Sequence, residues 1–277
     1  MAGAYVGYAF FRTPEEASGP IEAVPLVLEE DRQDEESESP DSESEETAAA
    51  PVEDDAATDG ESESESSDES ASEAESADSG TDASTTDTSD ESAAVSLTVF
   101  EIVQVESQAR FYIDEVLRGD PVTVEGITDQ VAGQIALNPD DLSSAQIGTV
   151  LVNARTFATD NDFRNRAISN KILLTDDNEF VTFEPTEIIG LPENGTAGES
   201  YAFQIVGDLT IIGSTQQVTF DATVTPTSET RLEGVATTTI LYADYGVTIP
   251  ASQSVDAVED DLRLEINFVA EAVAVDA

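Results

Sequence analysis

The 277-residue sequence predicts an all-β domain of about eight antiparallel strands with one short helix, behind a long acidic linker. Three observations indicate this arrangement. Apolar and polar residues alternate with a period of two through residues 93–277, which is typical of strands that bury one face. Clusters of Gly, Pro, Asn and Asp separate the alternating stretches. Residues 29–92, in contrast, contain a single large apolar side chain, Val52.

The N-terminal segment, residues 1–28, begins with an apolar run rich in aromatic residues. Ala2 to Phe11 carry no charge and are followed by Arg12. A spanning helix needs about 20 apolar residues and a signal peptide needs a basic start, so neither fits. Aromatic residues beside an arginine resemble the interfacial end of a membrane helix. We expect a truncated membrane anchor, the alternative being a short apolar terminus without function, and we expect Ile21 to Leu28 to be the edge of the linker.

Residues 29–92 hold 27 acidic residues and one base, Arg32. Such a segment cannot bury enough apolar surface to offset the entropy lost on ordering, so we expect a disordered, self-repelling linker. As a coil it would span about 45 Å. One interpretation is a tether that holds a domain away from a surface, and the alternative is a solubilising tail.

The third segment, residues 93–277, is the expected folded domain, and it is also acidic. It carries 30 acidic residues against seven Arg and Lys171, a net charge of −22. A folded domain this acidic fits a protein from a halophile, because high salt screens the repulsion between carboxylates. With so many carboxylates, close pairs arise by chance and are weak evidence for acid–base catalysis.

Within residues 93–277, the alternation and the turn residues mark the elements. Alternation predicts strands over 109–114, 131–137, 203–211, 218–224 and 262–268. Turns are expected at 138–141, 192–195, 213–215 and 258–261. A helix is expected over 160–171, capped by Thr159 or Asp160. A closed barrel or a sandwich suits this pattern, and closure is favoured because it removes exposed edge strands.

An eight-stranded barrel is wide enough to be filled by side chains or to hold one small ligand. Gly133, Gly207 and Ala222 lie among the inward positions and leave room for an apolar ligand, although a packed core is the alternative. The residues expected to line the lumen are Phe111, Ile113, Ile135, Val150, Val152, Phe183, Phe203, Ile205, Leu209, Ile211, Phe220, Leu264 and Ile266.

The composition excludes several classes of function. The chain has no His and no Cys, so it lacks a conventional nucleophilic triad, disulfides and zinc knuckles, and its acidity argues against nucleic acid as a partner. Residues 160–162 begin like a calcium loop, but the required Gly and Glu are absent, so a helix start is expected. We expect no metal, no cofactor and no catalysis. A carboxylate hydrolase is the minor alternative. It would need a carboxylate inside the barrel, whereas Asp208, Asp221 and Glu265 are all expected to point outward.

Four segments of the folded part resemble motifs of one family. Residues 207–218 read GDLTIIGSTQQV and are similar to its pattern G-D-L-T-I-R-G-x-T-x-x-V. Residues 156–166, 180–184 and 243–247 resemble its crossing into a short helix, its I-T-F strand and its S-D-F-G-I corner. The segments occur in the family's order and cover residues 97–272. On these motifs the chain resembles the YceI-like, polyisoprenoid-binding domains.

The resemblance implies a lipocalin-like, eight-stranded antiparallel barrel whose apolar lumen holds a long isoprenoid chain. It also implies a location outside the cytoplasm, either tethered to the membrane or secreted. The sequence departs from the family where residues 114–117 read DEVL instead of supplying a basic or His residue, and where Tyr242 and Ile212 replace arginines. These changes affect any polar head-group contact and leave the apolar tail site unaffected.

Together these observations predict non-catalytic carriage or storage of an isoprenoid-type lipid, such as a polyisoprenoid or an isoprenoid quinone. The alternative is a structural or adhesive cell-surface β-domain with a packed core and no ligand. The N-terminus is expected to bring the protein close to a membrane, and a homodimer is left open. Asn194 begins a glycosylation sequon on an expected turn.

Overall fold

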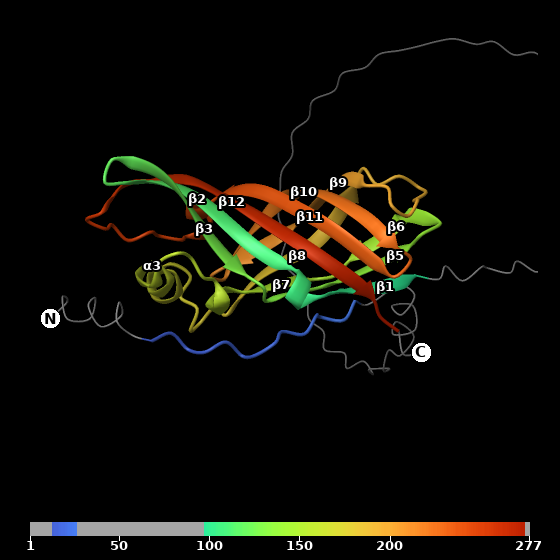
Figure 1. Cartoon of the computed structure of the whole chain (residues 1–277), viewed down its shortest axis with the longest axis horizontal. Helices are drawn as coiled ribbons and strands as arrows, with labels where there is room; N and C mark the ends of the chain where they lie inside the picture. Colours follow the sequence, from blue (N-terminus) through green and yellow to red (C-terminus); the bar gives the residue numbers. More distant parts are fainter. Residues whose placement is uncertain (1–12, 27–96, 275–277) are drawn as a thin grey trace, which may run out of the picture. The chain divides into compact units, whose positions relative to one another are not determined.

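The computed structural model describes residues 13–26 and 97–274 (Figure 1). The expected anchor at residues 2–11 and the whole of the acidic linker, residues 29–92, lie outside these residues. The strands are β1 Thr98–Ile102, β2 Gln108–Leu117, β3 Asp120–Thr128, β4 Val131–Ala132, β5 Gln134–Asn138, β6 Asp141–Ile147, β7 Val150–Asn153, β8 Phe180–Ile189, β9 Tyr201–Ile211, β10 Ser214–Ser228, β11 Arg231–Leu241 and β12 Val255–Ala272. The helices are η1 Gln104–Glu106, η2 Ala154–Thr156, α3 Asp162–Ala167, the π-helical η3 Ile168–Ile172 and η4 Tyr242–Tyr245.

The strands pair antiparallel all the way round and close a barrel. From β7 to β12 each strand pairs with the next. β11 occupies one edge of β12, and β1 and β2 both pair with its other edge. β2 pairs in turn with β3, and β1 pairs with β5. Gly133 alone separates β4 from β5, and these two strands pair with β7 and β6. The ladder therefore returns to its start. Because β1 with β2, β3 with β4 and β5, and β6 with β7 are three interrupted strands, the twelve segments make eight, which confirms the predicted eight-stranded barrel with one or two short helices.

The predicted strands lie inside observed ones, and one predicted turn is wrong. Residues 109–114, 203–211, 218–224 and 262–268 fall in β2, β9, β10 and β12, and 131–137 is split between β4 and β5. Ile212 and Gly213, with φ of 45° and 76°, make the tight turn expected at 213–215. Residues 258–261 do not turn. They lie within β12, where the pairing with β2 skips from Val258 to Leu262, so the acidic run forms a bulge instead.

The helix is capped by Asn161, one residue after Asp160 and two after Thr159, the two predicted caps. The Asn161 side chain accepts hydrogen bonds from the backbone N–H groups of Phe163 and Arg164 at 2.9 and 3.2 Å, which is the geometry of an N-cap. Thr159 supports this turn from outside, because its backbone N–H donates to Asn165 Oδ1 at 2.8 Å. Residues 160–162 are therefore a helix start, as expected. Neither α3 nor any other helix in the described ranges is long and apolar enough to span a membrane.

An N-terminal strap, residues 13–26, lies along the outside of the barrel and is the blue segment of Figure 1. Its first half is fixed at Glu179, which accepts from the Ser18 backbone N–H at 2.7 Å and from the Ser18 hydroxyl at 2.5 Å. Its second half is fixed where Gln104 donates to the carbonyl of Ile21, whose side chain is only 7% exposed. The Leu26 backbone N–H then donates to Gln134 Oε1 at 2.9 Å.

The strap differs from the expectation that Ile21 to Leu28 is the edge of a linker. Pairing with distant barrel residues holds Ile21 to Leu26 in place, and the local sequence does not signal this. The acidic segment consequently runs from one point on the barrel, Leu26, to another, Leu97. It is a connection between two barrel-bound ends, so it does not separate the barrel from an anchor at residues 2–11.

Strap docking is expected to weaken in acid. Burial alone would raise the pKa of Glu179, but the hydrogen bonds from Ser18 and the charge of Arg155, 3.1 Å away, outweigh it and lower the pKa below its usual 4.5. A lowered pKa in the docked state stabilises docking above the free carboxyl's pKa, and this contribution is lost as the pH falls through the lowered value. The protection factors of the Ser18 and Leu26 amides, measured from pH 7 to about 3, should fall below about pH 4.5.

The matched variant for this test is Glu179→Gln, which keeps the side-chain shape and removes the charge. It should lower strap protection at neutral pH and abolish the acid transition, while the amides of β9 and β10 keep theirs. An unchanged acid transition in Glu179→Gln would show that another group controls the strap.

Candidate functional site

The interior of the barrel holds two apolar cavities that lie end to end. The smaller has a volume of about 100 Å³ and the larger about 190 Å³. The two share four wall residues, Val150, Phe183, Phe220 and Ile266, which we call the waist. An engineered cavity of roughly 150 Å³ stays dry and binds benzene, so both are of a size that takes apolar groups.

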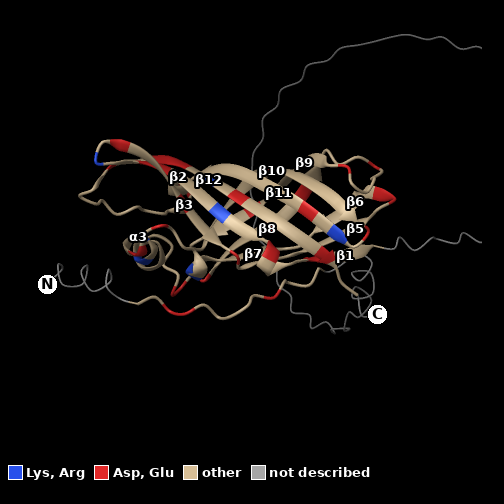
Figure 2. Ribbon diagram, in the orientation of Figure 1, with Lys and Arg blue, Asp and Glu red and all other residues tan. Residues whose placement is uncertain are grey.

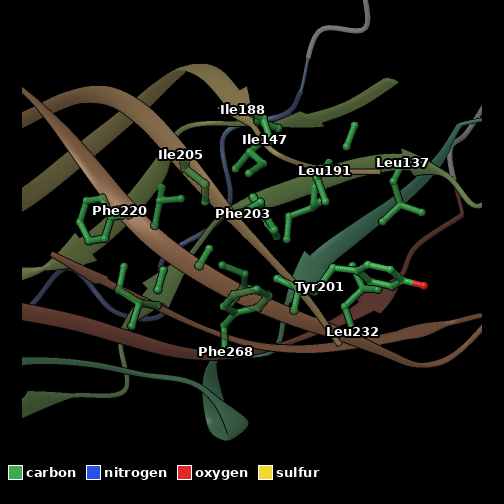
Figure 3. Close-up of a pocket in the computed structure, with 18 of the residues that line it drawn as sticks. Leu137, Ile147, Ile188, Leu191, Tyr201, Phe203, Ile205, Phe220, Leu232 and Phe268 are labelled. Atoms are coloured by element: carbon green, nitrogen blue, oxygen red, sulfur yellow. The ribbon is translucent and has the colours of Figure 1, made fainter. Parts of the chain in front are cut away.

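The smaller cavity is lined by residues from β1 and from β5 to β12. Figure 3 shows Phe220 at one end of this cavity and Leu137 and Tyr201 at the other. Among the described residues of its wall, only Gln134 and Tyr201 have polar side chains. Since the described wall carries no charged side chain, this cavity suits a hydrocarbon.

The larger cavity lies on the other side of the waist and is closed partly by α3 and η3. Its wall includes Phe111, Phe157 and Leu264, with the rings of Phe111 and Phe157 packed edge to face at 5.3 Å. Unlike the smaller cavity, it also has charged residues in its wall: Arg110, Glu115, Arg164 and Glu265. Polarity therefore differs between the two ends of the lumen.

Two of the charged residues in this wall, Glu115 and Arg164, pair at 2.9 Å. The period of two along β2 brings Glu115 to the same face as Phe111 and Ile113, and its side chain is 8% exposed. Arg164 comes from the first turn of α3 and also binds Asp160 at 2.5 Å. The guanidinium is therefore already neutralised by two carboxylates.

A second ion pair, between Arg110 and Glu265 in the wall of the larger cavity, joins β2 and β12. Arg110 Nη1 lies 3.4 Å from Glu265 Oε1, and both side chains are less than a third exposed. Tyr242, from η4, also lines this cavity and donates to Asp260 at 3.4 Å. Burial, followed by the nearby charge of Asp260, raises the pKa of Tyr242, so its hydroxyl keeps its proton.

All thirteen residues named from the sequence lie in the walls of these cavities. Ile135, Phe203 and Ile205 line the smaller one, Val150, Phe183, Phe220 and Ile266 form the waist, and Phe111, Ile113, Val152, Leu209, Ile211 and Leu264 line the larger one. That they contact a bound ligand stays a prediction.

The sequence reasoning missed the polar residues at the larger cavity. Glu115 follows Phe111 and Ile113 at the same spacing of two, so the alternation that placed those residues inside could have placed Glu115 there as well. Arg164 and Tyr242 belong to helical turns between strands, and no periodic signal points to them. Their position depends on how η4 and α3 fold over the end of the barrel.

The carboxylates considered for hydrolysis fall into two groups. Asp208 and Asp221 are in neither cavity wall, which agrees with the outward orientation expected of them. Glu265 contributes to the wall of the larger cavity, but it alternates along β12 with the inward Leu264 and Ile266, and its carboxylate pairs with Arg110 on the outer face, as expected. Among residues 13–26 and 97–274 there is no cluster of three or more acidic residues that could hold a metal ion. Asn194 lies exposed in the β8–β9 loop, and its glycosylation stays a prediction.

Comparisons with known proteins agree with this architecture. A UPF0312 protein of Staphylococcus epidermidis is 29% identical over 157 residues, which cover 54% of this chain and 83% of that protein. BcnA of Burkholderia cenocepacia shares the fold, with a TM-score of 0.50 at 17% identity over 61% of this chain and 98% of BcnA. A polyisoprenoid binding domain from Saccharophagus degradans, implicated in plant cell wall breakdown, gives a TM-score of 0.48 at 14% identity over 63% and 98% of the two chains. The model of the YceI-like domain matches residues 100–270, so the chain belongs to the YceI-like domain family.

Proposed function

We propose that this protein binds an isoprenoid-type lipid in the lumen of its barrel and carries or stores it without transforming it. The observation that carries the proposal is the pair of apolar cavities arranged end to end along the lumen. An elongated apolar space favours a chain over a compact ligand. Each buried methylene of such a chain would contribute about 0.8 kcal/mol to binding.

The polar residues of the larger cavity indicate where the head group would lie. The tail would occupy the smaller cavity, whose described wall carries no charge, and the head group would lie toward Glu115, Arg164 and Tyr242. Arg164 is already paired with Glu115 and Asp160, so it has little positive charge to offer a diphosphate. A neutral head group that can hydrogen-bond, such as an alcohol or a quinone carbonyl, fits better.

The proposed place of action is outside the cytoplasmic membrane, with residues 2–11 at the membrane surface. The support is the aromatic run before Arg12 and the docking of the strap directly after it. With the strap bound to the barrel, an anchor at residues 2–11 would hold the lumen close to the bilayer. A short distance would suit exchange of a lipid that is insoluble in water.

Protein purified from its native cells is expected to carry a neutral isoprenoid lipid in near-stoichiometric amount, most of it in the membrane fraction. Ala222, 3% exposed, lines the smaller cavity, and Ala222→Leu would fill part of it at a cost of roughly 1–3 kcal/mol in stability. Lipid recovery, measured by solvent extraction and mass spectrometry, should fall severalfold in this variant.

The matched control is Ala202→Leu, the same substitution at an exposed position of β9, which should retain the lipid. Recovery of no lipid from any of the three proteins would contradict the proposal and favour the packed structural or adhesive domain. Recovery of a diphosphate would contradict the assignment of the head group.

A further inference from the structure

The waist is the level of the barrel at which β7, β8, β9 and β12 pass from one cavity to the other. On β9, Phe203 and Ile205 line the smaller cavity and Leu209 and Ile211 line the larger, with Gly207 between them. On β12 the change falls at Ile266. The two cavities are therefore parts of one lumen that side chains divide.

The side chains that divide the lumen are chiefly two aromatic rings. Phe183 of β8 and Phe220 of β10 pack edge to face with centroids 4.9 Å apart and an interplanar angle of 62°. Both are buried, at 7% and 3% exposure. Gly207, on the strand between them, provides the space, because a Cβ there would lie 2.7 Å from Cε2 and Cζ of Phe183. The missing side chain on β9 thus allows the ring to lie across the lumen.

The cavity volumes show why this division matters for a lipid. The two cavities measure about 100 and 190 Å³, whereas a cavity of roughly 150 Å³ is filled by one benzene molecule. An isoprene unit has five carbons and is close to benzene in size, so either cavity alone holds only a short piece of chain. A longer chain fits only when it passes the waist.

We propose that Phe183 and Phe220 form a gate that sets the length of the isoprenoid chain the lumen retains. This inference rests on the proposed lipid binding. With the rings in contact, the chain is confined to one side of the waist. Rotation of the rings would join the cavities and admit a longer chain, at the expense of their edge-to-face contact. Phe183 and Phe220 would accordingly determine specificity for chain length, while the other wall residues determine specificity for apolar ligands in general.

The test compares lipid-free full-length protein with its Phe183→Ala and Phe220→Ala variants, using geraniol, farnesol and geranylgeraniol, isoprenoid alcohols of increasing length, of which geraniol is short enough to lie on one side of the waist. Each gate variant should raise the affinity for geranylgeraniol relative to geraniol at least tenfold. The matched control is Phe203→Ala, which removes an identical ring that lines only the smaller cavity and should leave the ratio unchanged. Phe183→Leu and Phe220→Leu serve as milder variants, and thermal unfolding confirms that each variant is folded.

The outcomes separate the gate from lipid binding itself. An unchanged ratio in folded gate variants that still bind geraniol would overturn the gate and leave the lumen as a lipid site. An equal shift in Phe203→Ala would also overturn it, because added volume alone would then explain the effect. Failure of the unaltered protein and of every variant to bind any of the alcohols would overturn the proposed function and the gate with it.

Discussion

Transfer from about 3 M to about 0.1 M salt is expected to lower the melting temperature of the barrel steeply, because the Debye length grows from a few ångströms to about 10 Å. Residues 93–277 carry a net charge of −22, and Figure 2 shows acidic residues spread over the strands and loops of the barrel with few basic residues between them. Some of the few basic side chains contact more than one carboxylate. Arg231, for example, contacts Glu106, Glu233 and Glu271. These contacts raise the pKa of Arg231, so it keeps its charge, but one cation cannot neutralise three carboxylates.

Circular dichroism melts across a sodium chloride series measure this effect. A variant that removes three exposed carboxylates, Glu184→Gln, Glu187→Gln and Glu259→Gln, should show a smaller loss of melting temperature at low salt. Its melting temperature at high salt should change little, because screening already suppresses the repulsion there. A melting temperature independent of salt would contradict the halophilic interpretation and leave the acidity unexplained.

The barrel and its apolar lining could be predicted from the sequence because a strand has a strict period of two. Once Phe203 and Ile205 are assigned to the inside, Leu209 and Ile211 follow from the same alternation. The same rule could have placed Glu115 in the lumen, but a charged residue breaks the apolar pattern by which inward positions were recognised. Burial of that carboxylate depends on Arg164, 49 residues further along the chain.

The features that the sequence did not predict depend on contacts between distant residues. The strap has no periodicity, and its docking requires Glu179 and Gln104, which are far from it in sequence. The waist requires that Gly207 and Phe183 meet at one level of the barrel, which depends on the register between β8 and β9. Residues 258–261 read as a turn because acidic residues are typical of turns, but pairing of β12 with β11 and β2 overrides that local preference.

The second large effect is expected at the Glu115–Arg164 pair. Arg164→Met should destabilise the barrel by about 2–4 kcal/mol, because it leaves an 8% exposed carboxylate unpaired in an apolar wall. The loss should lie toward the lower end of that range, since Arg164 itself is 22% exposed. Glu115→Leu should cost less, because Arg164 keeps its contact with Asp160. Chemical denaturation at high salt measures each change.

The double variant Glu115→Leu with Arg164→Met tests whether the effect belongs to the pair. Replacing both charges with apolar groups removes the unpaired carboxylate, so its stability should recover to near that of the unaltered protein. Arg166→Met is the matched control, being the same substitution at an exposed position of α3, and should have little effect. Additive losses in the double variant would mean that the two side chains stabilise the barrel independently. The larger cavity would then hold two separate charges, and the argument for a neutral head group beside Arg164 would fail.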